Sequence, residues 1–252
     1  MNETIKHQLN HRTIRFYQEK PVEAEIRETI YQVINQNVSS IALQAFTVIR
    51  VSDPVKRAKI ADICKQPYVK TVPEFLLFLI DCHRNSQLAQ EQGHPANAYH
   101  TVDFFFQGAA DAYLAAQNAT NAIESLGLGA VYFGSVLNDA QAIIDLFDLP
   151  PLVMPLLGLG YGYPNDAAGL KPRMSMDLKL GENVYPKVDN MSQAIADYDA
   201  ILQTYYDTRN ANQRSESFSH LVTQRYQLSS PLRNDYLKVA KQQGFEFFLN
   251  EE

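Results

Sequence analysis

The sequence has no tryptophan, only two cysteines and no long apolar run. Two thiols, Cys64 and Cys82, are too few for a disulfide framework in a chain of 252 residues, which favours a reducing, cytoplasmic setting. No run of about eighteen apolar residues occurs, so no transmembrane helix is expected. The N-terminal stretch MNETIKHQLN has no apolar core and so does not match a signal peptide. We therefore expect no membrane partner.

Basic residues are in the minority, because 22 Lys and Arg stand against 28 Asp and Glu, for a formal net charge of -6. General nucleic-acid binding needs a basic face, and an acidic chain argues against it. Any anion site must therefore be a local cluster of basic side chains.

The familiar catalytic motifs are also missing. There is no GxSxG, no P-loop and no HExxH, and the six histidines lack metal-ligand spacing, so no metal is expected. No side chain is marked as a nucleophile or general base, so no catalytic side chain is expected. A chain with phosphate-type cations but no catalytic side chains is typical of a protein whose bound cofactor carries the chemistry.

Hydrophobic periodicity predicts a mixture of helices and strands. Helices are expected over 1–10, 22–36, 53–64, 101–127, 139–148, 192–209, 218–227 and 232–245. Strands are expected over 46–51, 73–81, 129–136 and 151–164, the last running into a glycine-rich turn. With no repeat and no linker, we expect one α+β domain over 1–252, with a helical C-terminal extension over 192–252. The helix over 101–127 is nearly apolar all round, which suggests the protein centre or a subunit interface.

Three basic stretches could bind anions. Residues 11–15, HRTIR, would place Arg12 and Arg15 on one face if they were helical. Residues 170–173, LKPR, hold Lys171 and Arg173 on a backbone stiffened by proline. Residues 208–217, TRNANQRSES, carry Arg209 and Arg214, which could hold the extra phosphate of NADPH. Taken alone, each stretch is more typical of a solvated surface segment than of an anion site.

A glycine-bearing stretch, ESLGLGAVYFGSV over 124–136, is the other feature of interest. Its glycines allow a sharp turn or a close approach to a planar ligand. It is not a dinucleotide fingerprint, because the glycines follow a helix and their spacing differs. A plain helix-to-strand turn explains Gly127 and Gly129 well, and Gly134 less well.

In this order the motifs HRTIR, KQPYV, ESLGLG with its Tyr-x-Gly, LKPR and TRNANQR resemble the oxygen-insensitive nitroreductase and flavin reductase family, in its NADPH-preferring branch. The resemblance implies a nitroreductase-like α+β fold with a central, mainly antiparallel sheet flanked by helices, in an intertwined homodimer. It implies bound FMN, NADPH (or NADH) as co-substrate, and ping-pong hydride transfer to small nitro, quinone, azo or flavin acceptors.

The resemblance also implies roles for individual residues. The expected FMN-binding residues are His11, Arg12, Thr13, Arg15, Ser39, Ser40, Gln66, Tyr68, Tyr132, Phe133, Gly134, Ser135, Lys171 and Arg173. The first four and the last two would hold the phosphate and ribityl chain. The others would surround the flavin ring, with residues 132–135 using backbone groups. Arg209 and Arg214 would hold NADPH.

Two other classes of function remain open at this stage. A non-catalytic flavin carrier or regulatory protein would share the phosphate cluster but need no nicotinamide site. A purely structural protein could use the helix over 101–127 as a dimer face without binding flavin.

Overall fold

The computed structural model describes residues 1–94, 98–165, 168–208 and 217–247. The chain divides into two compact units. The first contains residues 1–168 and 230–252, and the second contains residues 169–229. Each unit is described by itself below.

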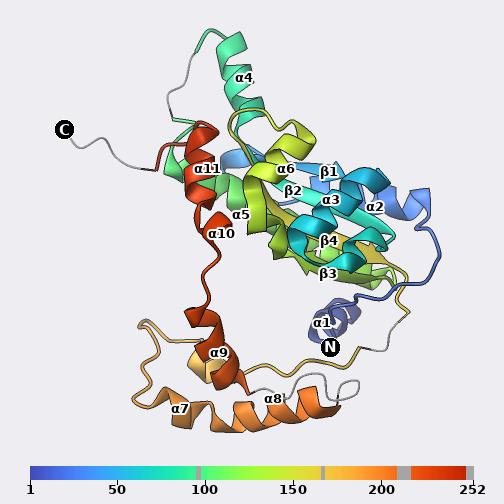
Figure 1. Ribbon diagram of the computed structural model, residues 1–252, viewed down its shortest axis with the longest axis vertical. Coiled ribbons are helices and arrows are strands. Elements are labelled where there is room, and N and C mark those ends of the chain that lie inside the picture. The colour runs from blue at the N-terminus through green and yellow to red at the C-terminus, as the bar shows by residue number, and fades with distance from the viewer. Residues whose placement is uncertain (95–97, 166–167, 209–216, 248–252) are drawn as a thin grey trace. The chain divides into compact units, whose positions relative to one another are not determined.

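A four-stranded antiparallel sheet forms the centre of the first unit, in the order β1-β2-β4-β3 (Figure 1). The strands are β1 (Phe46–Arg50), β2 (Glu74–Asp81), β3 (Gly129–Phe133) and β4 (Val153–Gly162). All eight residues of β2 are buried, as the apolar run predicts for a central strand. The expected α+β fold with an antiparallel sheet is confirmed.

Helices cover both faces of this sheet (Figure 1). Leu76, Phe78 and Ile80 of β2 pack with α2 (Ala24–Asn35) and α5 (Val102–Ser125). The alternate residues Phe75, Leu77 and Leu79 pack with α3 (Pro54–Cys64) and α6 (Ala140–Phe147). Because successive side chains of a strand point to opposite faces of the sheet, β2 contributes to two separate hydrophobic cores. Because α5 lies against the sheet with a stripe of alanines, its backbone can approach closely.

Strand β4 corrects one expectation. The glycines of LLGLGYG lie inside this strand and not in a turn after it. A Cβ on Gly160 would lie 2.8 Å from the ring of Phe133, so the missing side chain makes room for that aromatic. Pro155 is tolerated in this central strand because the register with β2 shifts beside it, between Phe78 and Leu79.

The remaining helices of the first unit are α1 (Glu3–Leu9), α4 (His83–Glu91), α10 (Pro231–Asn234) and α11 (Tyr236–Gln242). The second unit contains α7 (Met191–Ala194), α8 (Ala196–Thr208) and α9 (Phe218–Gln227). Helix α4 is not among the helices expected from the sequence, and the helices expected over 192–209 and 232–245 are each broken in two.

Two helices have residues typical of helix ends at their termini. Asp53 caps α3 by accepting hydrogen bonds from the backbone amides of Val55 and Lys56. Gly127 follows α5 with a φ of +76°, the left-handed conformation that favours glycine after a helix. Among the described residues, no helix has both the length and the apolar character needed to cross a membrane.

Candidate functional site

The basic segment over 11–17 is extended and lies along the edge strand β3. Thr13 forms a parallel bridge with Ala130, and the amide of Ile14 donates to the carbonyl of Ala130 at 2.9 Å. The bare backbone of Gly129 makes this contact possible, because a Cβ there would lie 2.4 Å from Cγ1 of Ile14. The segment is therefore tied to the strand that follows the ESLGLG motif.

This geometry overturns the idea that Arg12 and Arg15 share a helical face. In an extended segment alternate side chains share a side, so Arg15 groups with Thr13 and not with Arg12. Arg12 lines a cavity of about 220 Å³ with Gly129. Arg15 lines a different cavity, of about 580 Å³. Neither guanidinium makes a hydrogen bond or ion pair with any residue in the described ranges, so both remain available to an anion.

An aromatic wall stands beside the same segment. The ring of Tyr68 packs on that of Phe133 with centroids 5.4 Å apart, and Phe75 supports Phe133 from behind at 5.3 Å. The Tyr68 hydroxyl donates to Oε1 of Gln66 at 2.8 Å, which fixes the two side chains relative to each other. The structure thus brings Gln66, Tyr68 and Phe133, three of the predicted ring contacts, into one cluster.

Tyr17 joins this wall to the basic segment, although no motif in the sequence marks it as a site residue. Its hydroxyl donates to the carbonyl of Ile14 at 2.7 Å and lies 3.4 Å from that of Gly160. Burial, with a further contribution from the neighbouring Tyr68, raises the pKa of Tyr17 well above its ordinary value. The phenol therefore stays protonated and works as a fixed donor that holds the segment over 11–17 against the sheet.

Open space lies where β3 ends. Apart from its neighbours in sequence, no described residue lies within 4 Å of a Cβ built on Gly134, so a ligand could approach the residue from this side. The carbonyl of Gly134 already accepts a hydrogen bond from Nη1 of Arg233 at 3.1 Å. Ser135, the next predicted contact, has a buried hydroxyl that faces Cys64. Burial raises the pKa of the Cys64 thiol and the Ser135 hydroxyl partly offsets this, so Cys64 is an unreactive thiol behind the site.

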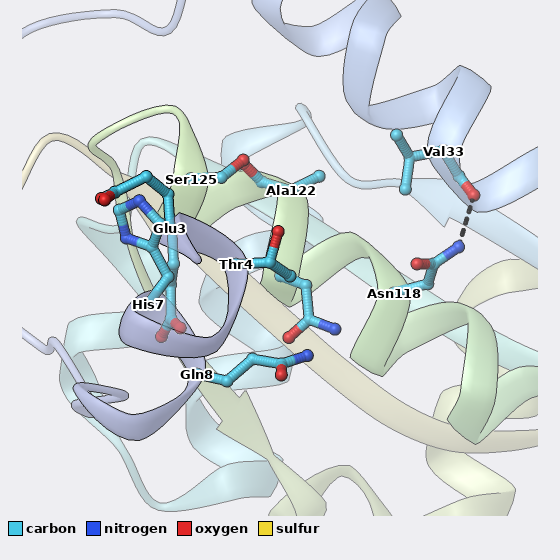
Figure 2. A pocket seen from close by; sticks show the side chains of 10 residues that line it. Glu3, Thr4, His7, Gln8, Val33, Asn118, Ala122 and Ser125 are labelled. Atoms are coloured by element: carbon cyan, nitrogen blue, oxygen red, sulfur yellow. Dashed lines mark hydrogen bonds between the residues drawn. The ribbon is translucent and has the colours of Figure 1, made fainter. Parts of the chain in front are cut away.

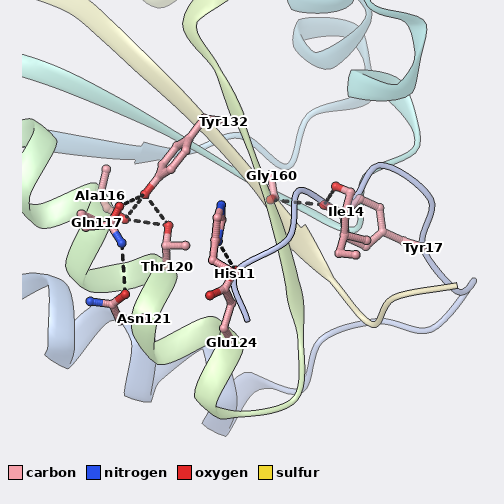
Figure 3. Close-up of polar contacts among 10 residues, drawn as sticks. All are labelled: His11, Ile14, Tyr17, Ala116, Gln117, Thr120, Asn121, Glu124, Tyr132 and Gly160. Atoms are coloured by element: carbon pink, nitrogen blue, oxygen red, sulfur yellow. Dashed lines mark hydrogen bonds and ion pairs between the residues drawn. The ribbon is translucent and has the colours of Figure 1, made fainter. Parts of the chain in front are cut away.

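The side chain of Tyr132 points to helix α5 and not to this gap (Figure 3). Its hydroxyl lies 2.5 Å from Oγ1 of Thr120 and 3.1 Å from the carbonyl of Ala116, to which it donates. Burial raises the pKa of Tyr132, and the nearby carboxylate of Glu124 adds to the effect. Any contact of Tyr132 with a ligand is thus left to its backbone, as predicted.

Ser39 and Ser40 lie on a loop that a buried carboxylate holds in place. Asp111 of α5, only 2% exposed, accepts from the Ser39 hydroxyl at 2.7 Å and from the Ala45 amide at 2.9 Å. The amide of Ser40 adds a longer contact of 3.3 Å. The role of Ser39 and Ser40 toward a ligand stays a prediction. Asp111 was not predicted from the sequence, because a single acidic residue inside an apolar helix forms no distinctive pattern.

The same loop carries backbone strain. Ile41, Ala42 and Gln44 all have positive φ angles, of 43°, 60° and 49°, although none is glycine. Such conformations cost free energy and persist only where the surroundings enforce them. The hydrogen bonds to Asp111 supply that enforcement.

The other predicted cations do not belong to the described part of the first unit. Lys171 and Arg173 are exposed residues of the second unit, where Nη1 of Arg173 donates to the carbonyl of Lys171 at 2.7 Å. Their approach to the segment over 11–15 stays a prediction. Arg209 and Arg214 lie outside the described residues.

The residues that the first unit brings together fit a phosphorylated planar cofactor. Two arginines with no hydrogen-bond or ion-pair partner among the described residues suit a phosphate, and a half-buried glycine backbone beside an aromatic wall suits a flat ring. Within the described ranges, no group of three or more His, Cys, Asp or Glu side chains could hold a metal ion.

Comparisons with known proteins agree with this geometry. The model of the nitroreductase family matches residues 9–163, and that of the nitroreductase family C-terminal domain matches residues 171–248. The chain therefore belongs to the nitroreductase family, and the resemblance seen in the motifs is confirmed.

Individual relatives cover nearly the whole chain. An FMN reductase (NADPH) from Bacillus subtilis (strain 168) is 34% identical over 242 residues, which cover 94% of this chain and 97% of that protein. The structure of B. megaterium NfrA2 matches with a TM-score of 0.92 and 31% identity, covering 99% of this chain and all of that one. The NADPH:FMN oxidoreductase from Vibrio harveyi, complexed with NAD+, matches at 0.86 and 32%, covering 97% and 99%.

Proposed function

We propose that this protein is an FMN-dependent NAD(P)H oxidoreductase. The observation that carries the proposal is the placement of HRTIR along β3, beside the open backbone of Gly134 and the Tyr68 wall. Two relatives support the choice of cofactor and co-substrate, since one is an FMN reductase that uses NADPH and another is an NADPH:FMN oxidoreductase complexed with NAD+.

In this proposal the basic segment holds the FMN phosphate. Arg12 and Thr13 bind it from the first unit together with His11, and Lys171 and Arg173 contribute from the second. Arginine is suited to this because its fork donates parallel hydrogen bonds to phosphate oxygens. Because this clamp would use charged donors, loss of one should cost about 1.5 to 3 kcal/mol of binding free energy.

The flavin ring would lie against backbone groups and the aromatic wall. Residues 132–135 offer their backbone to the ring, with Gln66 and Tyr68 at its edge. Bound FMN supplies hydride acceptance and donation, so the protein needs no general base of its own. What the chain provides is a fixed anchor and a surface that excludes water from one side of the ring.

We also propose a homodimer and small-molecule acceptors. Helix α5 leaves large apolar side chains exposed on one stripe, with Phe106 at 63%, Tyr113 at 46% and Leu114 at 47%. Such a stripe is typical of an interface with another copy. The acceptors are nitro compounds, quinones, azo dyes or free flavin, and a cytoplasmic location stays a prediction.

The test is the FMN affinity of clamp variants, measured by quenching of flavin fluorescence. Arg12→Ala and Lys171→Ala should each weaken FMN binding by about 1.5 to 3 kcal/mol. Lys59→Ala and Lys179→Ala, which remove exposed lysines in the same two units, serve as matched controls and should leave it unchanged. Unchanged affinity in both clamp variants would refute the assignment.

A second experiment separates an enzyme from a flavin carrier. If Arg209 and Arg214 hold NADPH, replacing both with alanine should raise the KM for NADPH and leave FMN binding intact. A carrier would show no NADPH oxidation to lose. NADPH oxidation that is present but indifferent to both substitutions would refute the role of these two arginines.

A further inference from the structure

The carboxylate of Glu124 lies beside the basic segment that is proposed to bind the phosphate, where a negative charge is unfavourable. Oε1 of Glu124, in the last turn of α5, is 2.5 Å from Nδ1 of His11, although the residues are 113 positions apart (Figure 3). The Glu124 side chain is only 13% exposed and that of His11 33%. A largely buried carboxylate beside a phosphate site would repel the ligand unless the histidine neutralised its charge.

The hydrogen bond restricts which nitrogen of His11 carries a proton. An ionised carboxylate only accepts, so Nδ1 must be the donor toward Glu124. In the neutral ring that leaves Nε2 with a lone pair, which would repel a phosphate oxygen. Only the imidazolium, protonated on both nitrogens, can donate to Glu124 and to an anion at once. A neighbouring carboxylate favours that charged form.

The other ionisable groups around this pair come from three elements. Glu124 lines the cavity of about 220 Å³ together with His7 of α1 and with Arg12. On its other side it lines a cavity of about 470 Å³, where His7 and Glu3 of α1 also lie (Figure 2). Tyr132 of β3 stays neutral because its pKa is raised. Arg12 and Glu3, which line these two cavities, carry opposite charges and so act on His11 in opposite directions.

We propose that Glu124 is a positioning residue for the cofactor phosphate. It holds the His11 ring through Nδ1 and keeps the ring an imidazolium, so that Nε2–H donates to the phosphate. This inference rests on the proposed function, because it needs a bound FMN. The proposal gives a role to Glu124, the first residue of the motif ESLGLG, in addition to the roles of the glycines in that motif.

The first part of the test needs no flavin. The His11 imidazole signals of the apo protein are followed by NMR against pH, with His11→Gln used for assignment. The wild-type pKa should exceed its ordinary value of about 6.5, and Glu124→Gln should lower it by about one unit or more. If the wild-type value is at or below 6.5, the proposal is overturned, even when Glu124→Gln fails to fold.

The second part measures FMN dissociation constants at pH 6 and pH 8. Relative to wild type, Glu124→Gln should weaken binding about tenfold more at pH 8 than at pH 6, because its His11 loses the proton within that window. Dividing the dissociation constant of the variant by that of wild type at the same pH cancels the effect of phosphate ionisation on FMN binding. An equal loss at both pH values would mean a merely structural role and would overturn the proposal.

A matched control comes from a second histidine–acid pair among the described residues. Nε2 of His100 lies 3.3 Å from Oε2 of Glu246, away from the site. Glu246→Gln should leave FMN affinity unchanged at both pH values, and a loss like that of Glu124→Gln would contradict a specific role for Glu124. A wild-type protein that binds no FMN would instead refute the proposed function. The NMR titration of His11 needs no FMN and would still show whether Glu124 raises the pKa of His11.

Discussion

Ile14 packs so closely on Gly129 that any side chain at residue 129 would overlap it, with Cγ1 of Ile14 2.4 Å from the position of a Cβ. Gly129→Ala should therefore push the segment over 11–15 away from β3. We expect a loss of about 1 to 3 kcal/mol in the free energy of unfolding, typical of overpacking, and at least tenfold weaker FMN binding. Urea unfolding and flavin titration measure the two effects.

Gly127→Ala is the control for that experiment. Residue 127 has open space around it but a positive φ, so alanine there is strained without touching the segment. It should cost about 1 kcal/mol of stability and leave FMN affinity unchanged. Equal FMN affinity in Gly129→Ala and wild type would contradict the role given to the Gly129–Ile14 contact.

Gly134→Val tests the gap at the end of β3. Because no described residue apart from its neighbours in sequence lies within 4 Å of a Cβ at this residue, the apo protein should lose less than about 1 kcal/mol of stability, the ordinary cost of a surface substitution. The new side chain would fill the space proposed for the flavin, and FMN affinity should fall at least tenfold. The account would fail here if the variant bound FMN as tightly as wild type.

Asp111 should prove essential to the loop over 39–45. Replacing it with alanine leaves the Ala45 amide and the Ser39 hydroxyl without their acceptor and should cost about 3 kcal/mol in urea unfolding. Asp111→Asn, which keeps the shape and one acceptor, should cost less. Asp103→Ala, on the exposed face of the same helix, is the control and should have little effect. Similar losses in Asp103→Ala and Asp111→Ala would contradict this account.

Stability should decline in alkali as thiols ionise. Burial, aided by the charge of Asp81, raises the pKa of Cys82 from 9.0 to about 12. The folded state therefore keeps the proton longer than the unfolded chain. The stabilisation is complete below pH 9 and is lost as pH rises toward 12, by about 1.4 kcal/mol per pH unit for this group.

Urea unfolding at pH 8, 8.5, 9 and 9.5 measures the onset of this decline while most tyrosines, with an ordinary pKa of about 10, keep their protons. Cys82→Ala should lower stability overall but reduce the decline above pH 9. An unchanged decline in that variant would show that other groups produce it.

Much of the fold could be predicted because local patterns and tertiary packing agree. The apolar run over 73–81 predicts a fully buried strand, and Asp53 with Pro54 predicts the start of α3. Helix α4 was missed because its sequence, HRNSQLAQE, has few apolar residues, with Leu88 exposed. Its helical state was not signalled by hydrophobic periodicity.

The site was predictable as a set of residues and not as a geometry. The spacing of Arg12 and Arg15 would put them on one face only if the segment were helical. Pairing with β3 makes it extended, and only the tertiary contact between Ile14 and Gly129 explains that. Glu124 belongs to the motif ESLGLG, yet its partner His11 is too distant in sequence for any local pattern to join them.

The most direct test of the central claim is an anaerobic titration of the FMN-loaded protein with NADPH, followed by flavin absorbance. The account predicts a yellow protein whose colour bleaches in proportion to added NADPH and returns when a quinone or nitro compound is supplied. A protein that takes up no FMN, or whose bound FMN keeps its colour in excess NADPH and in excess NADH, would contradict the account.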